Sequence, residues 1–264
     1  MIRVVVSGLG KMGREILLGL SRQEDIEPVG VLEKFSREEV FSLPDGSGRL
    51  IPCSTDPALL ERLTPDVVID FSNHEWTSVI APVAIQAGIR PVIGTTGLPD
   101  KLVDQLERDC AAAKLGGVVA ANFALGAVLL THLARTAAPF FENVEIIELH
   151  HDQKVDAPSG TALAIADELL RAREQRSFTY PETTKQTIPG TRGGERGGAG
   201  IHSIRLPGLV AHHEIIFGGL GQTLTLRHDS TSRESFLPGV LLATREVMRR
   251  EGLVRGLDRL MGLA

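Results

Sequence analysis

Cysteine is scarce in this sequence: only Cys53 and Cys110 occur among 264 residues, and there is no CxxC pair. A disulfide framework is thereby excluded, and such a composition is typical of proteins in a reducing compartment. We therefore expect a cytoplasmic protein whose two thiols are ordinary buried side chains.

Long apolar runs are missing as well. No segment has the roughly 20 consecutive apolar residues that cross a bilayer. The N-terminal run Ile2–Val6 is too short for the core of a secretory signal and is soon followed by Gly8. The sequence therefore predicts no membrane partner.

Basic residues are not in excess, since 28 Lys and Arg stand against 33 Asp and Glu, a formal net charge of -5. We expect no nucleic-acid partner, because binding a phosphate backbone requires a positive field. A zinc-binding HExxH motif is also missing, because His213-Glu214 is not followed by a second histidine four residues after His213. We therefore predict no metal and a small molecule as the ligand.

The first half of the chain alternates short β-branched runs with helical patterns. Strand-like runs are Ile2–Val6, Pro28–Leu32, Val67–Phe71, Pro91–Ile93 and Gly117–Ala121, and helical patterns are Met12–Leu20, Val79–Ala87 and Leu102–Ala112. Strands and helices that alternate in this way form βαβ units and a parallel sheet covered on both faces. We predict an α/β fold with an N-terminal, Rossmann-type doubly wound parallel sheet.

The pattern changes after Phe123. Helix, strand and helix patterns follow at Ala127–Ala137, Val144–Leu149 and Thr161–Arg171, and polar residues alternate with apolar ones in His202–Arg205, Val210–Phe217 and Gln222–Arg227. Alternation with period two is typical of strands with one wet face. A second, α+β domain with a mixed or antiparallel sheet is predicted. Val240–Arg250 is again helical, and its pattern leaves open which domain it joins.

Glycine is concentrated between Pro189 and Gly200. Such a composition predicts a mobile loop. Its Arg192 and Arg196 either keep the loop in solvent or cover a site, and the sequence leaves both interpretations open.

A dinucleotide-binding pattern opens the chain. The GxGxxG residues Gly8, Leu9, Gly10, Lys11, Met12 and Gly13 follow the first predicted strand and start the first helix. The glycines permit a tight turn and close approach of the backbone to a pyrophosphate, and the helix start offers N–H groups to the anion. We therefore predict NADH or NADPH as the cofactor.

Glu33 stands at the end of the second predicted strand, 20 residues after Gly13. A carboxylate there bonds a ribose 2'-hydroxyl and repels a 2'-phosphate, whereas Lys34 and Lys11 can neutralise that phosphate. We expect either dual use of the coenzymes or a preference for NADH.

Two loops follow later strands of the same predicted sheet. They contain Gly94, Thr95 and Thr96 in the first loop, and Ala120, Ala121, Asn122 and Phe123 in the second. Ligands of open α/β sheets lie beyond the carboxyl ends of the strands. We predict that both loops border the nicotinamide, although an ordinary turn also explains the first one.

Polar residues after the strand Val144–Leu149 predict the catalytic centre. His150 and His151 are adjacent, so their side chains point to opposite faces of an extended chain. Lys154 can bind a carboxylate or donate a proton. Histidines that only satisfy a polar core are the simpler alternative.

A helix start follows at Ser159, Gly160 and Thr161. Hydroxyls and backbone N–H groups at a helix N-terminus form a cradle for a carboxylate. Simple capping by Ser159 or Thr161 is the alternative. Lys154 and the helix start together predict an anionic substrate.

The segment Glu148–Ala162 contains HHxxK followed by DAPSGT. Through it the chain resembles the 4-hydroxy-tetrahydrodipicolinate reductase family, and the similarity includes the GxGxxG turn, Glu33, Gly200–Arg205 and Ser232–Phe236. The resemblance implies reduction of a cyclic imine dicarboxylate by NADH or NADPH in lysine and diaminopimelate biosynthesis.

The same resemblance implies roles for the site residues. His150 would donate or accept the proton and Lys154 would donate it, while substrate is bound by His151, Gly160 and Thr161, with Ser159 beside them.

The resemblance also implies a homotetramer built through the sheet of the second domain. Val240–Arg250 would return to the nucleotide domain. We therefore expect a dinucleotide-binding domain of residues 1–122 with 235–264, and a substrate-binding and oligomerisation domain of residues 123–234.

The second domain departs from the family pattern at two places. Val210–Glu214 contains Ala-His-His where the family often has Gly-Glu-His, and Gly221-Gln222 replaces a Gly-Glu. Another two-domain NAD(P)-dependent dehydrogenase and a dinucleotide-sensing protein without turnover remain the alternatives. An aspartate-semialdehyde dehydrogenase needs a nucleophilic cysteine near a cofactor loop, and neither cysteine has that setting.

Overall fold

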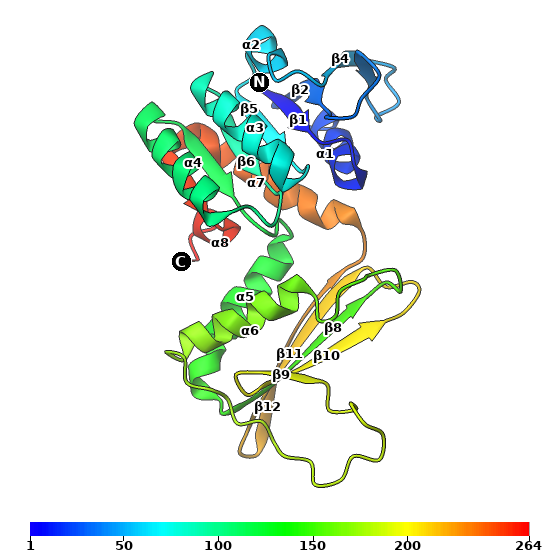
Figure 1. Ribbon diagram of the computed structural model, residues 1–264, viewed down its shortest axis with the longest axis vertical. Helices are drawn as coiled ribbons and strands as arrows, with labels where there is room; N and C mark the ends of the chain where they lie inside the picture. Colours follow the sequence, from blue (N-terminus) through cyan, green and yellow to red (C-terminus); the bar gives the residue numbers. More distant parts are fainter. Residues whose placement is uncertain (264) are drawn as a thin grey trace. The chain divides into compact units, whose positions relative to one another are not determined.

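The computed structural model describes residues 1–263, and these form two units (Figure 1). Unit 1 comprises Met1–Leu125 and the segment from Arg233 onward, and unit 2 comprises Gly126–Ser232. The chain therefore leaves unit 1 once and returns to it.

Unit 1 is built on an eight-stranded sheet with the order β13-β7-β6-β5-β1-β2-β4-β3. Its strands are β1 (Ile2–Ser7), β2 (Ile26–Leu32), β3 (Val40–Ser42), β4 (Leu50–Ser54), β5 (Val67–Asp70), β6 (Arg90–Ile93), β7 (Gly116–Val119) and β13 (Gly252–Arg255). Among the described strands of this sheet, only β3 and β4 pair antiparallel. Every residue of β5 is buried, as expected of a parallel strand covered on both faces. The predicted Rossmann-type sheet is confirmed.

Helices cover this sheet. They are α1 (Lys11–Ser21), α2 (Leu59–Leu63), α3 (His74–Gln86), α4 (Asp100–Ala113), α7 (Leu237–Glu246) and α8 (Leu257–Leu260), with the 3-10 turns η2 (Arg233–Phe236) and η3 (Val247–Arg249). A Cβ on Gly19 would lie 2.3 Å from a methyl carbon of Leu237, so α1 and α7 pack at close range. The predicted helix Val240–Arg250 therefore belongs to unit 1, and the short strand β13 after it was not predicted.

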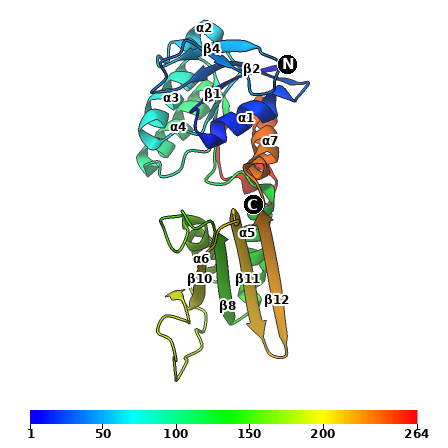
Figure 2. The ribbon, with the colours of Figure 1, turned by 90° about the vertical axis from the view of Figure 1, so that its right-hand side faces the viewer.

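Unit 2 has a five-stranded sheet with the order β12-β11-β8-β10-β9. Its elements are α5 (Leu125–Ala137), η1 (Ala138–Phe140), β8 (Asn143–His150), α6 (Gly160–Ala172), β9 (Gly194–Arg196), β10 (Ala199–Arg205), β11 (Ala211–Gly219) and β12 (Gln222–Ser230). The helices α5 and α6 lie on one face of the sheet (Figure 2). They pack there around Ile146, Ile215 and Phe217. Because β10 runs parallel to β8 and the other pairs are antiparallel, the predicted mixed sheet is confirmed.

The glycine-rich stretch contains more structure than its composition predicts. Gly194–Arg196 forms β9, which pairs with β10. Arg192 bonds Glu145 at 2.5 Å, and Arg196 bonds Asp167 at 2.6 Å. Both arginines therefore tie the stretch to unit 2 through ion pairs.

Strand β8 positions the candidate site of unit 2. Alternate residues are buried, and the last two of these are Glu148 and His150. The sheet register places Arg205 of β10 beside His150, and His213 of β11 opposite Glu148. Four polar side chains from three strands thus meet at the end of an otherwise apolar face.

Candidate active site

The glycine turn between β1 and α1 fits a dinucleotide phosphate. Gly8 has φ +95°, and a Cβ on Gly13 would lie 1.8 Å from the carbonyl oxygen of Gly8, so neither position accepts a side chain. A Cβ on Gly10 would meet nothing within 4 Å, which leaves that side of the turn open. No side chain caps α1, so its first N–H groups are available to an anion.

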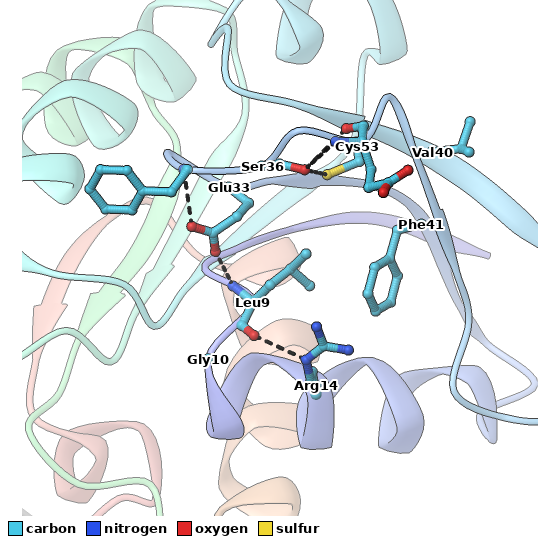
Figure 3. A pocket seen from close by; sticks show the side chains of 10 residues that line it. Leu9, Gly10, Arg14, Glu33, Ser36, Val40, Phe41 and Cys53 are labelled. Carbon is cyan, nitrogen blue, oxygen red and sulfur yellow. Dashed lines mark hydrogen bonds between the residues drawn. The ribbon is translucent and has the colours of Figure 1, made fainter.

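A cavity of about 460 Å³ lies beside this turn (Figure 3). Glu33, at the end of β2, lines it together with Leu9 and Gly10. The Glu33 carboxylate accepts hydrogen bonds from the backbone N–H groups of Leu9 at 2.6 Å and Phe35 at 3.3 Å. The turn and the acid expected to bind a ribose are thus held together by a direct hydrogen bond.

The basic residue that lines this cavity is Arg14, which sequence reasoning missed. Its guanidinium lies 5.3 Å from the ring centroid of Phe41, and its Nε donates to the Leu9 carbonyl at 3.2 Å (Figure 3). Lys34 instead pairs with Glu75 at 3.1 Å. The GxGxxGR spacing was the available signal, because it places Arg14 one residue beyond the last glycine.

The two predicted loops lie at the ends of β6 and β7. The Thr95 hydroxyl donates to buried Asp70 at 2.8 Å, whereas Thr96 is exposed. Phe123 is fully buried, with its ring 5.3 Å from that of Phe71. Thr95 and Phe123 therefore support the fold through their side chains, and only Thr96 presents a hydroxyl to solvent.

The three other residues of the second loop are Ala120, Ala121 and Asn122. Ala120 is buried and Ala121 is exposed. The Asn122 side-chain oxygen accepts from the N–H of Ala124 at 2.9 Å, so it shapes the loop locally.

In unit 2, Glu148 lies at the centre of the polar cluster. Its side chain is 0% exposed and accepts from His150 Nδ1, from two nitrogens of Arg205 at 2.7 and 2.9 Å, and from the N–H of Ser159 at 3.2 Å. Burial alone raises the pKa of Glu148, but hydrogen bonds from Arg205, Ser203 and His150 outweigh it and the pKa is lower than usual. Glu148 is therefore an ionised, fully paired carboxylate.

His150 is nearly buried, at 8% exposure. Burial lowers its pKa, Glu148 raises it, and the positive charges of Lys154 and Arg205 lower it further, with a net decrease. His150 is consequently neutral at pH 7, and Lys154 lies close enough to act on it electrostatically.

Lys154 holds a carboxylate of its own chain. Its Nζ donates to Asp156 Oδ1 at 2.6 Å. The hydrogen bond from Lys154 is the largest cause that lowers the pKa of Asp156, and the backbone N–H of Gly160 contributes. The Asp156 carboxylate is thus bound by the lysine, close enough to the start of α6 for the Gly160 N–H to affect its pKa. His151 is half-buried, and its carbonyl accepts from the Lys154 N–H at 3.2 Å.

Ser159 caps α6, because its hydroxyl accepts from the N–H of Ala162 at 3.2 Å. The capping alternative is therefore correct for this side chain. Gly160 is exposed, a Cβ there would meet nothing within 4 Å, and Thr161 beside it is half-buried. Open space in front of the helix start leaves room for a ligand.

His213 is a further residue that sequence reasoning gave no catalytic role. It is buried, its ring lies 5.5 Å from that of His150, and its Nε2 lies 3.4 Å from Ser159 Oγ. Burial, together with repulsion from His150 when that ring is protonated, lowers the pKa of His213 to about 4. His212 points to the other face and bonds Asp229 at 2.7 Å, so the two histidines divide the faces of β11 as predicted.

Among residues 1–263, no three His, Cys, Asp or Glu side chains are grouped so that they could hold a metal ion. Within the same range, no helix is long and apolar enough to cross a membrane.

Two family models together match nearly the whole chain. Residues 2–123 match "Dihydrodipicolinate reductase, N-terminus", and residues 126–261 match "Dihydrodipicolinate reductase, C-terminus". The chain belongs to the dihydrodipicolinate reductase family. It is therefore an NAD(P)H-dependent oxidoreductase of lysine and diaminopimelate biosynthesis, and the nucleotide is bound by the N-terminal domain.

Full-length relatives carry the same family assignment. The 4-hydroxy-tetrahydrodipicolinate reductases of Moorella thermoacetica and Dehalococcoides mccartyi are 47% and 44% identical to this chain, over 98% and 99% of both chains. A solved dihydrodipicolinate reductase from Paenisporosarcina sp. TG-14, with dipicolinate bound, is 41% identical with a TM-score of 0.86, covering 98% of this chain and 99% of the other. The predicted dihydrodipicolinate reductase family is confirmed.

Proposed function

We propose that unit 2 binds 4-hydroxy-tetrahydrodipicolinate between the end of β8 and the start of α6. Unit 1 binds NADH or NADPH at the glycine turn and Glu33, with Gly94–Thr96 and Ala120–Phe123 beside the nicotinamide. When bound, the coenzyme supplies the hydride. The net change replaces the C–OH of the substrate by C–H, with one hydride and one proton consumed and one water released.

The Asp156 carboxylate carries this proposal. It is held by Lys154 at 2.6 Å, and the Gly160 N–H at the start of α6 makes a small further contribution to its lowered pKa, so the two groups expected to bind a substrate carboxylate both act on Asp156. The site therefore has the donors and charge that bind one carboxylate, and a substrate carboxylate can exchange with that of Asp156. Dipicolinate, bound in the solved relative, is a dicarboxylate of the same size class.

His150 and Lys154 handle the protons in this proposal. They lie close enough for the lysine charge to lower the pKa of His150. Lys154, as an ammonium, both offsets the substrate charge and can donate a proton as negative charge develops. His151, Gly160 and Thr161 complete the binding site, and Ser159 contributes through the helix that it caps.

Coenzyme choice is set in the cavity beside the glycine turn. Glu33 and Glu38 contribute two carboxylates there against the single guanidinium of Arg14. The two carboxylates repel a 2'-phosphate, and the guanidinium of Arg14 attracts it. We therefore expect both coenzymes to be used, with a lower KM for NADH.

A homotetramer and a cytoplasmic location complete the proposal. The sheet face of unit 2 that the helices leave uncovered presents Ile147, Leu149, Ile204 and Ile216, and Ile204 is 42% exposed. These apolar side chains lie among polar ones such as Glu145 and His202, and a mixed face of this kind suits assembly with further copies of the chain. Both cysteines are free and buried, as is usual in a reducing compartment.

A rival dehydrogenase mechanism that needs a nucleophilic cysteine lacks support. Burial raises the pKa of Cys110 to about 12, so its thiolate is negligible at neutral pH. Contrary to expectation, Cys53 does line the cavity beside the glycine turn, but it is only 5% exposed and its thiol donates to the Ser36 hydroxyl at 3.4 Å. A protein that only senses dinucleotides would not need a lysine and a helix start directed at one carboxylate.

The test is oxidation of NADH and NADPH with 4-hydroxy-tetrahydrodipicolinate generated enzymatically in the cuvette. We expect substrate-dependent loss of the nicotinamide absorbance. Lys154→Ala should lower turnover by about 10²–10⁴-fold, the range of general acid catalysis, with NADH affinity nearly intact. Lys185→Ala, at an exposed lysine of unit 2, is the matched control and should not change turnover. Absence of substrate-dependent oxidation contradicts the function, and loss of NADH affinity in Lys154→Ala removes Lys154 from the substrate site.

A further inference from the structure

In the polar cluster on the buried face of β8, the hydrogen bonds all point toward the carboxylate of Glu148. Glu148 is fully buried, and each of its two carboxylate oxygens is paired with Arg205. One oxygen also accepts from the N–H of Ser159 and the other is paired with His150 Nδ1. An ionised carboxylate has no proton to donate, so all of these groups must donate to it.

This pattern determines the tautomer of His150. Since Glu148 can only accept, the Nδ1 of His150 must carry a hydrogen. A neutral imidazole has one N–H, so the Nε2 then carries a lone pair. The ring can accept a proton or a hydrogen bond at Nε2 and has none to give there.

Arg205 connects this carboxylate to the segment that carries Lys154. Its Nη2 donates to the Asp156 carbonyl at 2.6 Å as well as to Glu148. One guanidinium therefore holds both the partner of His150 and the backbone two residues after Lys154. Removal of the carboxylate charge would disturb His150 directly, while the backbone contact to Asp156 could persist.

We propose that Glu148, clamped by Arg205, is a positioning residue that keeps His150 as the Nδ1–H tautomer, so that His150 accepts at Nε2 and Lys154 is the proton donor. The proposal rests on the proposed function and divides its proton chemistry between the two residues. The groups that face His150 are Glu148 on its own strand, Arg205 of β10, His213 of β11 and Lys154 of the following segment.

The substitution Glu148→Gln tests the proposal while preserving the shape of the side chain. The amide oxygen can keep the hydrogen bonds from Arg205 Nη2 and the Ser159 N–H, whereas the amide NH₂ takes the place of the oxygen that faces His150 Nδ1 and loses the bond from Arg205 Nη1. That NH₂ donates, so His150 must accept at Nδ1 and carry its hydrogen on Nε2. The substitution should therefore invert the tautomer.

The same strand supplies a matched control. Glu145 is bonded by Arg192 at 2.5 Å and by His202 at 2.7 Å, on the opposite face of the sheet. Glu145→Gln removes the same charge from an Arg–Glu–His cluster that does not contact His150.

The tautomer is read by ¹⁵N NMR of the full-length protein labelled at histidine, without substrate, and His150→Asn assigns the signal. We expect the Nδ1–H pattern in wild type and in Glu145→Gln, and the Nε2–H pattern in Glu148→Gln. In the reductase assay, kcat should fall about 100-fold in Glu148→Gln with a smaller change in KM, the lower range for acid–base catalysis. Glu145→Gln should change kcat less than about 3-fold.

Three results overturn the proposal. They are an Nε2–H or doubly protonated His150 in wild type at pH 7.5, an unchanged tautomer in Glu148→Gln, and equal losses of kcat in the two glutamine variants. Because the NMR experiment needs no turnover, its outcome is independent of the reductase assay. A protein with the expected tautomer but no reductase activity would contradict the proposed function alone.

Discussion

Strand β8 carries one Arg–Glu–His cluster on each face, and the two differ in burial. Glu148 is 0% exposed and its arginine 19%, whereas Glu145 is 27% exposed and its arginine 29%. The buried cluster also contacts the start of α6 through Ser159, and the other one ties down the glycine-rich stretch that carries Arg192.

The comparison teaches that residue types alone do not make a catalytic centre. Both clusters satisfy one carboxylate with a guanidinium and an imidazole. Only the buried one adjoins a second cation, Lys154, and an open helix start. Function in this domain therefore follows from what the cluster adjoins.

The largest expected difference between the clusters is in stability. Arg205→Met leaves the Glu148 charge buried without its main partner, and breaking a buried ion pair in this way costs about 3–5 kcal/mol. Arg192→Met breaks a partly exposed pair, which costs at most about 1 kcal/mol. Denaturant unfolding measures both, with Trp76 as the probe of unit 1 and Tyr180 as the probe of unit 2. Equal losses of unfolding free energy in Arg205→Met and Arg192→Met would mean that burial does not distinguish the two clusters.

A smaller effect is expected in the pH dependence of stability. His213 adjoins only the buried cluster, and its folded pKa of about 4 lies below the usual 6.5. The unfolded chain therefore binds more protons, and stability that is complete above pH 6.5 is lost as the pH falls toward 4. The loss should be on the order of 3 kcal/mol, and His213→Gln should abolish most of it. If the free energy of unfolding falls equally between pH 7 and pH 4 in wild type and in His213→Gln, His213 is not the cause of the loss.

The smallest effect concerns the carboxylate next to the buried cluster. Asp156→Asn removes the negative charge that competes with a ligand for Lys154. We expect dipicolinate to bind about 2- to 5-fold more tightly by calorimetry, the range that exposed ion pairs contribute. Asp167→Asn, which breaks the pair with Arg196 on the flank of α6, is the control and should leave the affinity unchanged. Weaker binding to Asp156→Asn would mean that Asp156 assists the ligand.

Sequence reasoning was strongest where the signal is local. The glycine turn, Glu33 and the segment His150–Thr161 are contiguous or regularly spaced, so the dinucleotide fold and the family could be predicted. The same local reasoning found the capping alternative for Ser159, which the structure supports.

Residues joined by sheet register could not be found in this way. Arg205 lies 57 residues from Glu148, and His213 meets Glu148 only because β11 pairs with β8 in one particular register. In the sequence alone, nothing distinguishes Glu148 from the other residues of its strand. Arg14 was missed although the GxGxxGR spacing is local, and its partner Phe41 could not be found because the hairpin β3–β4 was not predicted.

The crystal structure of the protein with NADH and pyridine-2,6-dicarboxylate tests the central claim most directly. The account predicts one ligand carboxylate on Lys154 and the backbone N–H groups of Gly160 and Thr161, with Asp156 displaced and the ring facing His150 Nε2. A ligand bound elsewhere, with Asp156 still paired to Lys154, would contradict it.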